Sequence, residues 1–497
     1  MTAFENLGHL IGRGNDPEKI AIVDLGGETP PREFTYGKLG ALANGVARAL
    51  LKKGLGRGDR VAIVSANRAE YLAAVFGIMR AGLIAVPVNF KFPPETIAFI
   101  IKDAGADFIF CDAARRTDCP PGVPTVIFGE AFEHFIDTGP FDAVRQVRRE
   151  PAMFLYTSGS TGIPKGVVLS HQSHLWVVET RLKAQDISHH RFLVAAPLYH
   201  MNALAVSQLV CAGHATLVLL PQFTVAAYIA AIEKYRVTWV TAVPPMMAMM
   251  LREKDRMARA DLSSVESLRM GSAPVSESLM AALKTALPKA AITNAYGTTE
   301  GGPVVFGPHP KGLPTPSLSV GFPVAGVEVR LKGRDEGELE MKSPAIMNGY
   351  HNRPDLSSPI TKDGFYVTGD VFRRDADGFY FFVGRTDDMF VSGGENIYPG
   401  DVERMLERHP DIAQAAVVPI PDDIKGMKPV AFVVPQAARR LSEDEVKQYA
   451  LKHAPAYQHP RTVWFLERLP LSSTNKIDRS VLMRLAAERI ANLVTQS

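Results

Sequence analysis

The sequence has few cysteines and no continuous apolar run long enough to cross a bilayer. Its three cysteines, Cys111, Cys119 and Cys211, are too few to staple a chain of 497 residues, and they lack the clustered Cys/His spacing of a zinc site. Reduced thiols in a cytoplasmic protein are therefore expected. The most apolar stretch, residues 203–221, is interrupted by Ser, Gln, Gly and His, so no membrane span is expected.

Neither sign of charge is in large excess. Lys and Arg number 55 against 52 Asp and Glu, which gives a formal net charge of +3. No basic block that could follow a nucleic-acid backbone is present, so nucleic acid is not an expected partner. The N-terminal residues have neither the basic leader nor the apolar core of a secretory signal. The oligomeric state stays open between monomer and homodimer.

Apolar residues are abundant enough for several folding units. Hydrophobic residues make up 46% of the chain and charged residues 22%, which is close to the globular average and argues against extensive disorder. In the first third, β-branched runs such as residues 60–65 alternate with helical patterns such as residues 69–81, and the alternation recurs over 215–287. This alternation predicts parallel sheets with covering helices.

The pattern changes at about residue 319. Short strands separated by Gly and Asp turns, without helices between them, predict a small antiparallel sheet or barrel over residues 319–384. Mixed helices (400–408 and 443–453) and strands (413–419 and 429–434) follow. The expected fold class is therefore α/β. A large N-terminal domain over residues 1–386, with a β-barrel-like subdomain, would precede a small α+β domain over residues 387–497.

A loop suited to phosphate spans residues 156–166, with the sequence YTSGSTGIPKG. Glycines let backbone N–H groups approach phosphate oxygens, hydroxyls add donors, and Lys165 supplies positive charge. A Walker A loop would need Gly-Lys-Ser/Thr opening a helix, whereas Lys165 lies between Pro164 and Gly166 and precedes a strand-like run. An ordinary Gly/Ser hairpin loop is the alternative. The expected phosphate-binding residues are Thr157, Ser158, Gly159, Ser160, Thr161, Gly162 and Lys165.

At this loop the sequence resembles the adenylate-forming superfamily of acyl-CoA synthetases, luciferases and peptide-synthetase adenylation domains. Further matches follow in the family's order over nearly the whole chain: PLYH at 197–200, GSAP at 271–274, AYGTTEG at 295–301, YVTGD at 366–370, GRTDD at 384–388, SGGENIY at 392–398 and PLSSTNKIDR at 470–479. The resemblance implies an acyl-adenylate formed from ATP with pyrophosphate release, then a thioester with AMP release. The first step brings two anions together, so it needs cations and Mg²⁺ more than a base.

The resemblance also implies roles for individual residues in the nucleotide site. Glu300 would be the carboxylate associated with Mg²⁺, and Thr299 would contact the α-phosphate. Tyr296 would pack against adenine, while Asp370 and Arg385 would bind the ribose hydroxyls. The remaining expected nucleotide-binding residues are Gly271, Ser272, Ala273, Pro274, Ala295, Gly297 and Thr298.

Lys476 is implied to be a mobile lysine that reaches both the carboxylate and the α-phosphate during adenylation. Asn475 stands where the family usually has Gly, and Asn tolerates the same left-handed backbone. Asp387 takes the hinge position, so the small domain would rotate after adenylation. Gly393 and Gly394 would then line the path of the CoA pantetheine arm. Acylation of Lys476 as an off-switch stays open.

His200 is given a positioning role and no acid–base role, and the acyl pocket is expected beside Gly297, between the segment after His200 and that around Val243. Its candidate wall consists of Met201, Asn202, Val243, Met246, Gly271, Ser272, Ala273, Gly297, Val304 and Val305. No Arg or Lys is among these residues, so a dicarboxylate would leave its second charge unpaired, and a free amino acid would lack an acidic partner. The GGPV run at 301–304 is similar to hydroxycinnamate- and aryl-CoA ligases. An aryl or hydroxycinnamic acid is therefore expected, with a medium-chain fatty acid as the alternative.

Three other functions compete with a CoA ligase. The acyl acceptor could be a carrier-protein thiol, or oxygen as in luciferases, but no carrier module precedes Ser497, so CoA is the expected acceptor. An inactive nucleotide-binding regulator on the same fold is the third. The presence of the charged residues named above argues against that regulator.

Overall fold

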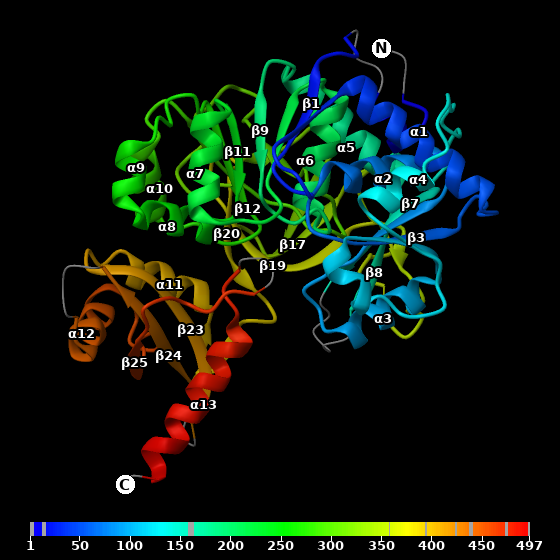
Figure 1. Cartoon of the computed structure of the whole chain (residues 1–497). Coiled ribbons are helices and arrows are strands. Elements are labelled where there is room, and N and C mark those ends of the chain that lie inside the picture. The colour runs from blue at the N-terminus through cyan, green and yellow to red at the C-terminus, as the bar shows by residue number, and fades with distance from the viewer. Residues whose placement is uncertain are drawn as a thin grey trace.

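The computed structural model describes residues 4–11, 16–157, 164–356, 358–392, 395–422, 425–436, 441–472 and 476–495. A large N-terminal lobe lies above a small C-terminal lobe, drawn in orange and red in Figure 1. None of the helices in these residues is long and apolar enough to cross a membrane. The expected α/β architecture, a large domain followed by a small one, is confirmed. The boundary between residues 386 and 387 stays a prediction.

Two seven-stranded sheets form the core of the large lobe. The first has the order β13 (Ala291–Ala295), β12 (Ser267–Gly271), β11 (Trp239–Ala242), β9 (Arg191–Val194), β10 (Thr216–Leu219), β1 (Ile20–Asp24) and β2 (Arg32–Thr35). The second has the order β18 (Gly349–Tyr350), β8 (Lys165–Ser170), β7 (Pro151–Thr157), β4 (Ile84–Pro87), β3 (Arg60–Val64), β5 (Ala106–Cys111) and β6 (Thr125–Ile127). The pairings are parallel except β1–β2, β7–β8 and β8–β18. The predicted parallel sheets are therefore present.

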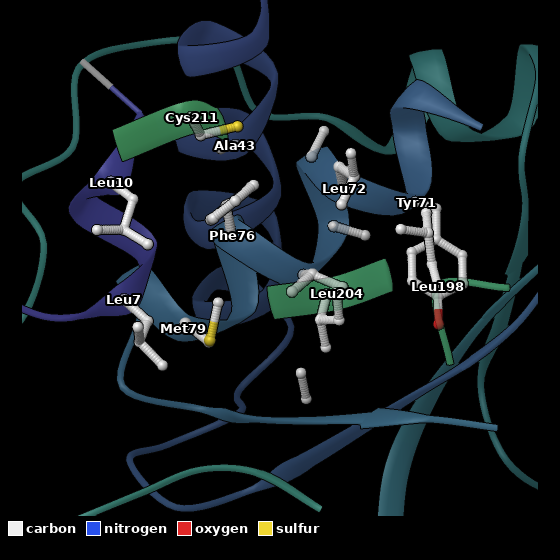
Figure 2. Close-up of a cluster of buried hydrophobic side chains, with 14 of the residues drawn as sticks. Leu7, Leu10, Ala43, Tyr71, Leu72, Phe76, Met79, Leu198, Leu204 and Cys211 are labelled. Atoms are coloured by element: carbon white, nitrogen blue, oxygen red, sulfur yellow. The ribbon is translucent and has the colours of Figure 1, made fainter. Parts of the chain in front are cut away.

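Helices cover these sheets, as the alternating pattern predicted (Figure 1). They are α1 (Tyr36–Lys52), α2 (Ala69–Arg80), α3 (Pro94–Ala104), α4 (Glu130–Phe135), α5 (His171–Ala184), α6 (Met201–Ala212), α7 (Val225–Lys234), α8 (Pro244–Arg252), α9 (Lys254–Arg259) and α10 (Glu277–Ala286), with 3₁₀ turns η1 (Leu7–Leu10) and η2 (Ala113–Asp118). Every residue of α2 is buried. Figure 2 shows Phe76 and Met79 of α2 among side chains from η1, α1 and α6.

Helices α1 and α2 cross closely at Gly77. A Cβ atom on Gly77 would lie 2.6 Å from the carbonyl oxygen of Ala43 and 2.7 Å from Cβ of Val46. Only glycine leaves room for this approach. The packing of α1 on α2 therefore depends on a missing side chain.

The residues after 319 form an antiparallel sheet, as expected. Its order is β16 (Glu328–Lys332), β17 (Glu336–Lys342), β19 (Tyr366–Arg374) and β20 (Tyr380–Arg385), and the two-stranded pair β14 (Phe306–Gly307) and β15 (Phe322–Pro323) lies beside it. Of the two forms expected, sheet or barrel, the pairing described is that of an open sheet with β16 and β20 at its edges.

The small lobe has a mixed sheet with helices. The elements are β21 (Phe390–Ser392), β22 (Glu395–Ile397), α11 (Pro399–Glu407), β23 (Ile412–Asp422), β24 (Gly426–Pro435), α12 (Glu443–His453), β25 (Thr462–Phe465) and α13 (Arg479–Thr495). Helix α12 has the predicted limits. Ser442 and Glu445 form a capping box there, which satisfies backbone N–H groups at its start.

Candidate active site

A cleft of about 2080 Å³ is lined by residues from both lobes. The carboxyl ends of parallel strands meet at one edge of a sheet, and the ends of β9, β11, β12 and β13 lead into this cleft. The structure brings most of the predicted site residues to it. These are Thr157, Lys165, His200, Met201, Asn202, Val243, Gly271, Ser272, Ala273, Pro274, Ala295, Tyr296, Gly297, Thr298, Thr299, Glu300, Asp370, Arg385, Asp387 and Lys476.

Some predicted residues do not line the cleft. Val304 is buried in a small cluster with Val177 and Ala345, and Met246 and Val305 are fully buried in core clusters. A further group of predicted residues lies outside the described residues: Ser158, Gly159, Ser160, Thr161, Gly162, Gly393, Gly394 and Asn475.

The predicted phosphate loop connects two antiparallel strands. Thr157 at the end of β7 pairs with Lys165 at the start of β8. A strand rather than a helix therefore follows the lysine, which excludes a Walker A arrangement. The pairing holds Thr157 and Lys165 together at the mouth of the loop, and both line the cleft.

Tyr350 connects two predicted charged residues, Lys165 and Glu300. Its hydroxyl donates to Oε1 of Glu300 at 3.2 Å, and Nζ of Lys165 lies 4.6 Å from its ring centroid. Strand β18 places it there by pairing Tyr350 with Val167 of β8. Burial and the Glu300 charge raise the pKa of Tyr350, so it stays a neutral donor. Nothing in the sequence pointed to Tyr350, because a single Tyr gives no local sign of its partners.

Both carboxylate oxygens of Asp370 accept hydrogen bonds. Oδ1 accepts from Nη1 of Arg385 at 2.8 Å, and Oδ2 accepts from the hydroxyl of Tyr296 at 2.5 Å. Asp370 and Arg385 are directly paired on β19 and β20. Burial raises the pKa of Asp370, while Arg385, the Tyr296 hydrogen bond and Lys476 oppose that rise. The bond from Tyr296 was not expected, and its ring packs edge-on against Phe372 at 4.8 Å.

Lys476 enters the cleft from the small lobe. The backbone N–H of Ser472 donates to the carbonyl of Lys476 at 2.7 Å, and Leu471 and Ile477 form an antiparallel bridge. Desolvation by the surrounding protein lowers the pKa of Lys476. The charge of Asp370 opposes this shift, and the charge of Arg385 adds to it. Lys476 and Asp370 line the same cleft.

His200 precedes α6 and is half-buried. Burial, with the positive charges of Lys476 and Lys91, lowers the pKa of His200 to about 3. The imidazole is therefore neutral at physiological pH. Its Nε2 is shielded from solvent and has no hydrogen-bond partner among the described residues.

Polar contacts join the two lobes beside the cleft. Nη2 of Arg252 on α8 donates to Oε1 of Gln414 at 2.9 Å, and Arg408 on α11 pairs with Glu277 on α10 at 3.3 Å. Asp387 lies in the segment between β20 and β21, and Nη2 of Arg385 donates to its Oδ2 at 3.4 Å. Contacts of this kind, mostly exposed, are weak individually.

Arg269 of β12 also lines the cleft, two residues before Gly271. It was not among the candidate wall residues. The premise that no cation reaches the acyl pocket, which weighed against a dicarboxylate, therefore does not hold for the cleft as a whole.

Comparison with protein families matches both lobes. Residues 13–351 match the AMP-binding enzyme family, and residues 401–476 match the AMP-binding enzyme C-terminal domain. Among curated proteins, the chain is 32% identical to feruloyl-CoA synthase of an Amycolatopsis species, covering 91% of this chain and 94% of that protein. It is 31% identical to 4-coumarate–CoA ligase 2 of Oryza sativa subsp. japonica, covering 92% and 88%.

Solved structures of similar proteins span nearly the whole chain. The anthranilate CoA ligase AuaEII, in complex with anthranoyl-AMP, has a TM-score of 0.88 at 26% identity and covers 98% of this chain and 99% of its own. ATP-bound MatB from Rhodopseudomonas palustris has a TM-score of 0.87 at 25% identity, covering 96% and 98%. The o-succinylbenzoate CoA synthetase of Bacillus subtilis, bound to its acyl-adenylate, has a TM-score of 0.83 at 27% identity, covering 97% and 98%.

Proposed function

This chain belongs to the AMP-binding enzyme family, and from that premise we propose that it is an ATP-dependent ligase joining a carboxylic acid to CoA through an acyl-adenylate. The observation that carries the proposal is that charged residues from distant segments of the chain lie together. Lys165, Glu300, Asp370, Arg385 and Lys476 come from segments up to 311 positions apart (476 − 165), and all line one cleft.

In the first half-reaction, an oxygen of the substrate carboxylate attacks the α-phosphorus of ATP, and the bond to the pyrophosphate oxygen breaks. Two anions meet in this step, so fixed positive charge is the main requirement. Lys165 would hold the departing phosphates, and Lys476 would lie between the carboxylate and the α-phosphate. Asp370 and Arg385 would hold the ribose, and Tyr296 would pack beside adenine. No residue is needed as a general base.

The carboxylate of Glu300 is a suitable ligand for Mg²⁺. It supplies a hard carboxylate at the cleft, where the phosphate oxygens of ATP would complete an oxygen ligand set. Tyr350 donates to Oε1 of Glu300, so this carboxylate oxygen serves as an acceptor. Bound there, Mg²⁺ would neutralise phosphate charge. Thr299, beside Glu300, would contact the α-phosphate.

In the second half-reaction, the CoA sulfur attacks the acyl carbonyl carbon, and AMP leaves with the former carboxylate oxygen. Asp387 would be the hinge on which the small domain, residues 387–497, rotates. Gly393 and Gly394 would then line the pantetheine path. The position of Lys476 in the cleft supports an arrangement suited to adenylation. His200 would position the substrate carboxylate as a neutral imidazole.

We infer an aryl or hydroxycinnamic acid as the substrate class, with a medium-chain fatty acid as the alternative. The names of two relatives, feruloyl-CoA synthase and 4-coumarate–CoA ligase, support the aryl class. Met201, Asn202, Val243 and Gly297 would form the pocket wall, with Asn202 hydrogen-bonding a ring substituent. A cytoplasmic location is proposed from the three cysteines, which are all free and buried.

The test is pyrophosphate release with Mg-ATP across cinnamic, benzoic, short-chain and medium-chain acids, with and without CoA. Multiple turnovers that require both an acid and CoA are expected. Binding of ATP without release for any acid or acceptor would instead support an inactive nucleotide-binding regulator.

A further inference from the structure

Arg269 places a guanidinium on the substrate side of the large lobe. Along β12, Leu268 and Met270 belong to the core cluster shared with α7, α8 and α10. Side chains alternate between the faces of a strand, so Arg269 and Gly271 lie on the other face. That face continues through Trp239 of β11 into the cluster that contains Met201 and Leu204 of α6. Arg269 therefore lies on the side of the sheet that α6 covers, and it lines the cleft.

The Arg269 guanidinium has no acidic partner within the described part of the chain. Among the described residues, none forms an ion pair or side-chain hydrogen bond with Arg269 that meets ordinary distance limits. Its neighbours in β11 and β13 are Thr241 and Thr293, which are uncharged. The charged group that acts on it is Arg181 of α5, a second cation.

The surroundings therefore disfavour the charge on Arg269. Burial, together with the positive charge of Arg181, lowers the pKa of Arg269 to about 9. Most buried charges in proteins are paired, because the desolvation cost of a single buried ion is large. An arginine kept unpaired at the wall of a substrate cleft is in place for an anion that arrives with the ligand.

A solvated structural arginine is the simpler alternative. It would account for exposure to the cleft, but it gives no reason for a cation at an interior strand position beside another cation. Met or Leu at residue 269 would fill the same space without the desolvation cost. The alternative also predicts no effect of Arg269 on which acid is used, so the two can be separated.

We propose that Arg269 binds a second carboxylate at the far end of the acyl group, so that the preferred substrate is a dicarboxylic acid whose other carboxylate is activated. This inference rests on the proposed ligase function and deepens it by adding a second carboxylate to the aryl or aliphatic acid. The reacting carboxylate lies at the end of the cleft with Gly297 and Lys476. The guanidinium pairs with the remote carboxylate through two parallel N–H···O bonds. A dicarboxylate substrate was not expected because its second carboxylate would have been unpaired. Arg269 supplies the cation that pairs with it.

The experiment compares acids that differ only in the second carboxylate: isophthalate with benzoate, and glutarate with valerate. kcat/KM for pyrophosphate release is measured with Mg-ATP and CoA in the wild type and in Arg269→Met, Arg269→Lys and Arg259→Met. Arg259 is an exposed residue of α9 and serves as the matched control. In the wild type, the dicarboxylate of at least one pair is expected to be favoured by about 10²-fold.

Arg269→Met should abolish that preference by lowering kcat/KM for the dicarboxylate while leaving the monocarboxylate unchanged or improved. Arg269→Lys should recover part of it, and Arg259→Met should leave it intact. A wild type that prefers the monocarboxylate in both pairs would overturn the inference, as would a preference that Arg269→Met does not change. A merely structural role would lower kcat/KM for both acids of a pair equally.

A second readout separates this inference from the ligase function. The rise in melting temperature produced by isophthalate or glutarate with ATP requires binding but no turnover. Absence of pyrophosphate release with every acid would contradict the ligase function. A dicarboxylate-specific rise in the wild type that is lost in Arg269→Met would still support the anion site. No difference between the two proteins would reject it.

Discussion

At the scale of single residues, the charged groups of the cleft are held by neutral hydroxyls as well as by opposite charges. Tyr296 donates to Asp370, and Tyr350 donates to Glu300. Both tyrosines have a pKa raised by burial and by the neighbouring carboxylate, so they remain donors. Such bonds fix the direction of a carboxylate without cancelling its charge, which a nucleotide or metal ligand still requires.

Lys476→Ala is expected to lower pyrophosphate release by about 10²- to 10³-fold, the size of effect seen when a preorganised charge is removed from a transition state. Thioester formation from a supplied acyl-adenylate should be largely spared, because Lys476 is assigned only to the first half-reaction. Each half-reaction is measured separately. Lys452→Ala, an exposed lysine of α12, is the control. Equal losses in both half-reactions would contradict the role given to Lys476.

Tyr350→Phe removes the hydroxyl that bonds Glu300 but keeps the ring beside Lys165. Because one hydrogen bond to a charged group contributes about 1.5 kcal/mol, the Mg-ATP concentration for half-maximal rate should rise about tenfold. Tyr350→Leu removes both contacts and should raise it further. The measurement is the initial rate of pyrophosphate release at varied Mg-ATP. An unchanged value in Tyr350→Phe would show that the hydroxyl does not orient Glu300.

At the scale of elements, close packing and strand alternation decide which side chains reach the cleft. Helix α2 is buried on all sides between η1, α1 and α6. On β12, alternation sends Leu268 and Met270 to the core and leaves Arg269 and Gly271 for the substrate side. The function of a strand residue therefore follows from its face.

Gly77→Ala should destabilise the large lobe by about 2 kcal/mol, in the range for overpacking, because its Cβ would meet the Ala43 carbonyl at 2.6 Å. The expected readout is a lower melting temperature. Gly40→Ala is the matched control in α1, where the nearest heavy atom would be 3.6 Å away. That substitution should be neutral or stabilising by up to about 1 kcal/mol, since Ala favours helix over Gly. Equal effects of the two changes would exclude the close crossing as the cause.

At the scale of the whole molecule, the position of the small lobe decides whether Lys476 is in the cleft. Two contacts join the lobes while Lys476 lies in the cleft: Arg252 with Gln414, and Arg408 with Glu277. Glu407 of α11 lies at the same junction, with Ser276, the N-cap residue of α10, beside it. Burial raises the pKa of Glu407 to about 7, with Glu403 adding to the rise and the Ala415 N–H, Ser276 and Arg404 opposing it.

Docking of the lobes should therefore weaken as the pH rises through about 7. The docked carboxyl binds its proton more tightly than an exposed Glu of ordinary pKa 4.5, so docking is favoured at lower pH and loses this contribution between pH 4.5 and 7. Energy transfer between labels on α9 and α12, followed from pH 5.5 to 8.5, measures the docked fraction. Glu407→Gln should stay docked across the range. The same pH dependence in Glu407→Gln would assign the effect to another group.

Local pattern was enough to predict many of the elements. Residues 443–453 were expected as a helix and form α12, and the run after Lys165 was expected as a strand and forms β8. The charged residues of the nucleotide site were reached through motif resemblance, and the cleft contains them. Tyr350 and Arg269 were not reached, because neither lies in a motif and neither has a sequence neighbour that reveals its environment.

The sequence by itself determined the periodicity of each segment, the strands that flank the phosphate loop and the set of charged residues available for adenylation. These depend on side chains close together in the chain, whose spacing is fixed by covalent geometry. The tertiary structure decided that Tyr350 meets Lys165 and Glu300, because that contact needs β18 to pair with β8 across nearly two hundred residues. It also decided that Arg269 has no acidic partner among the residues that the structure describes. Which faces of the strands and helices pack against each other depends on burial across the whole core. No short segment of the sequence determines it.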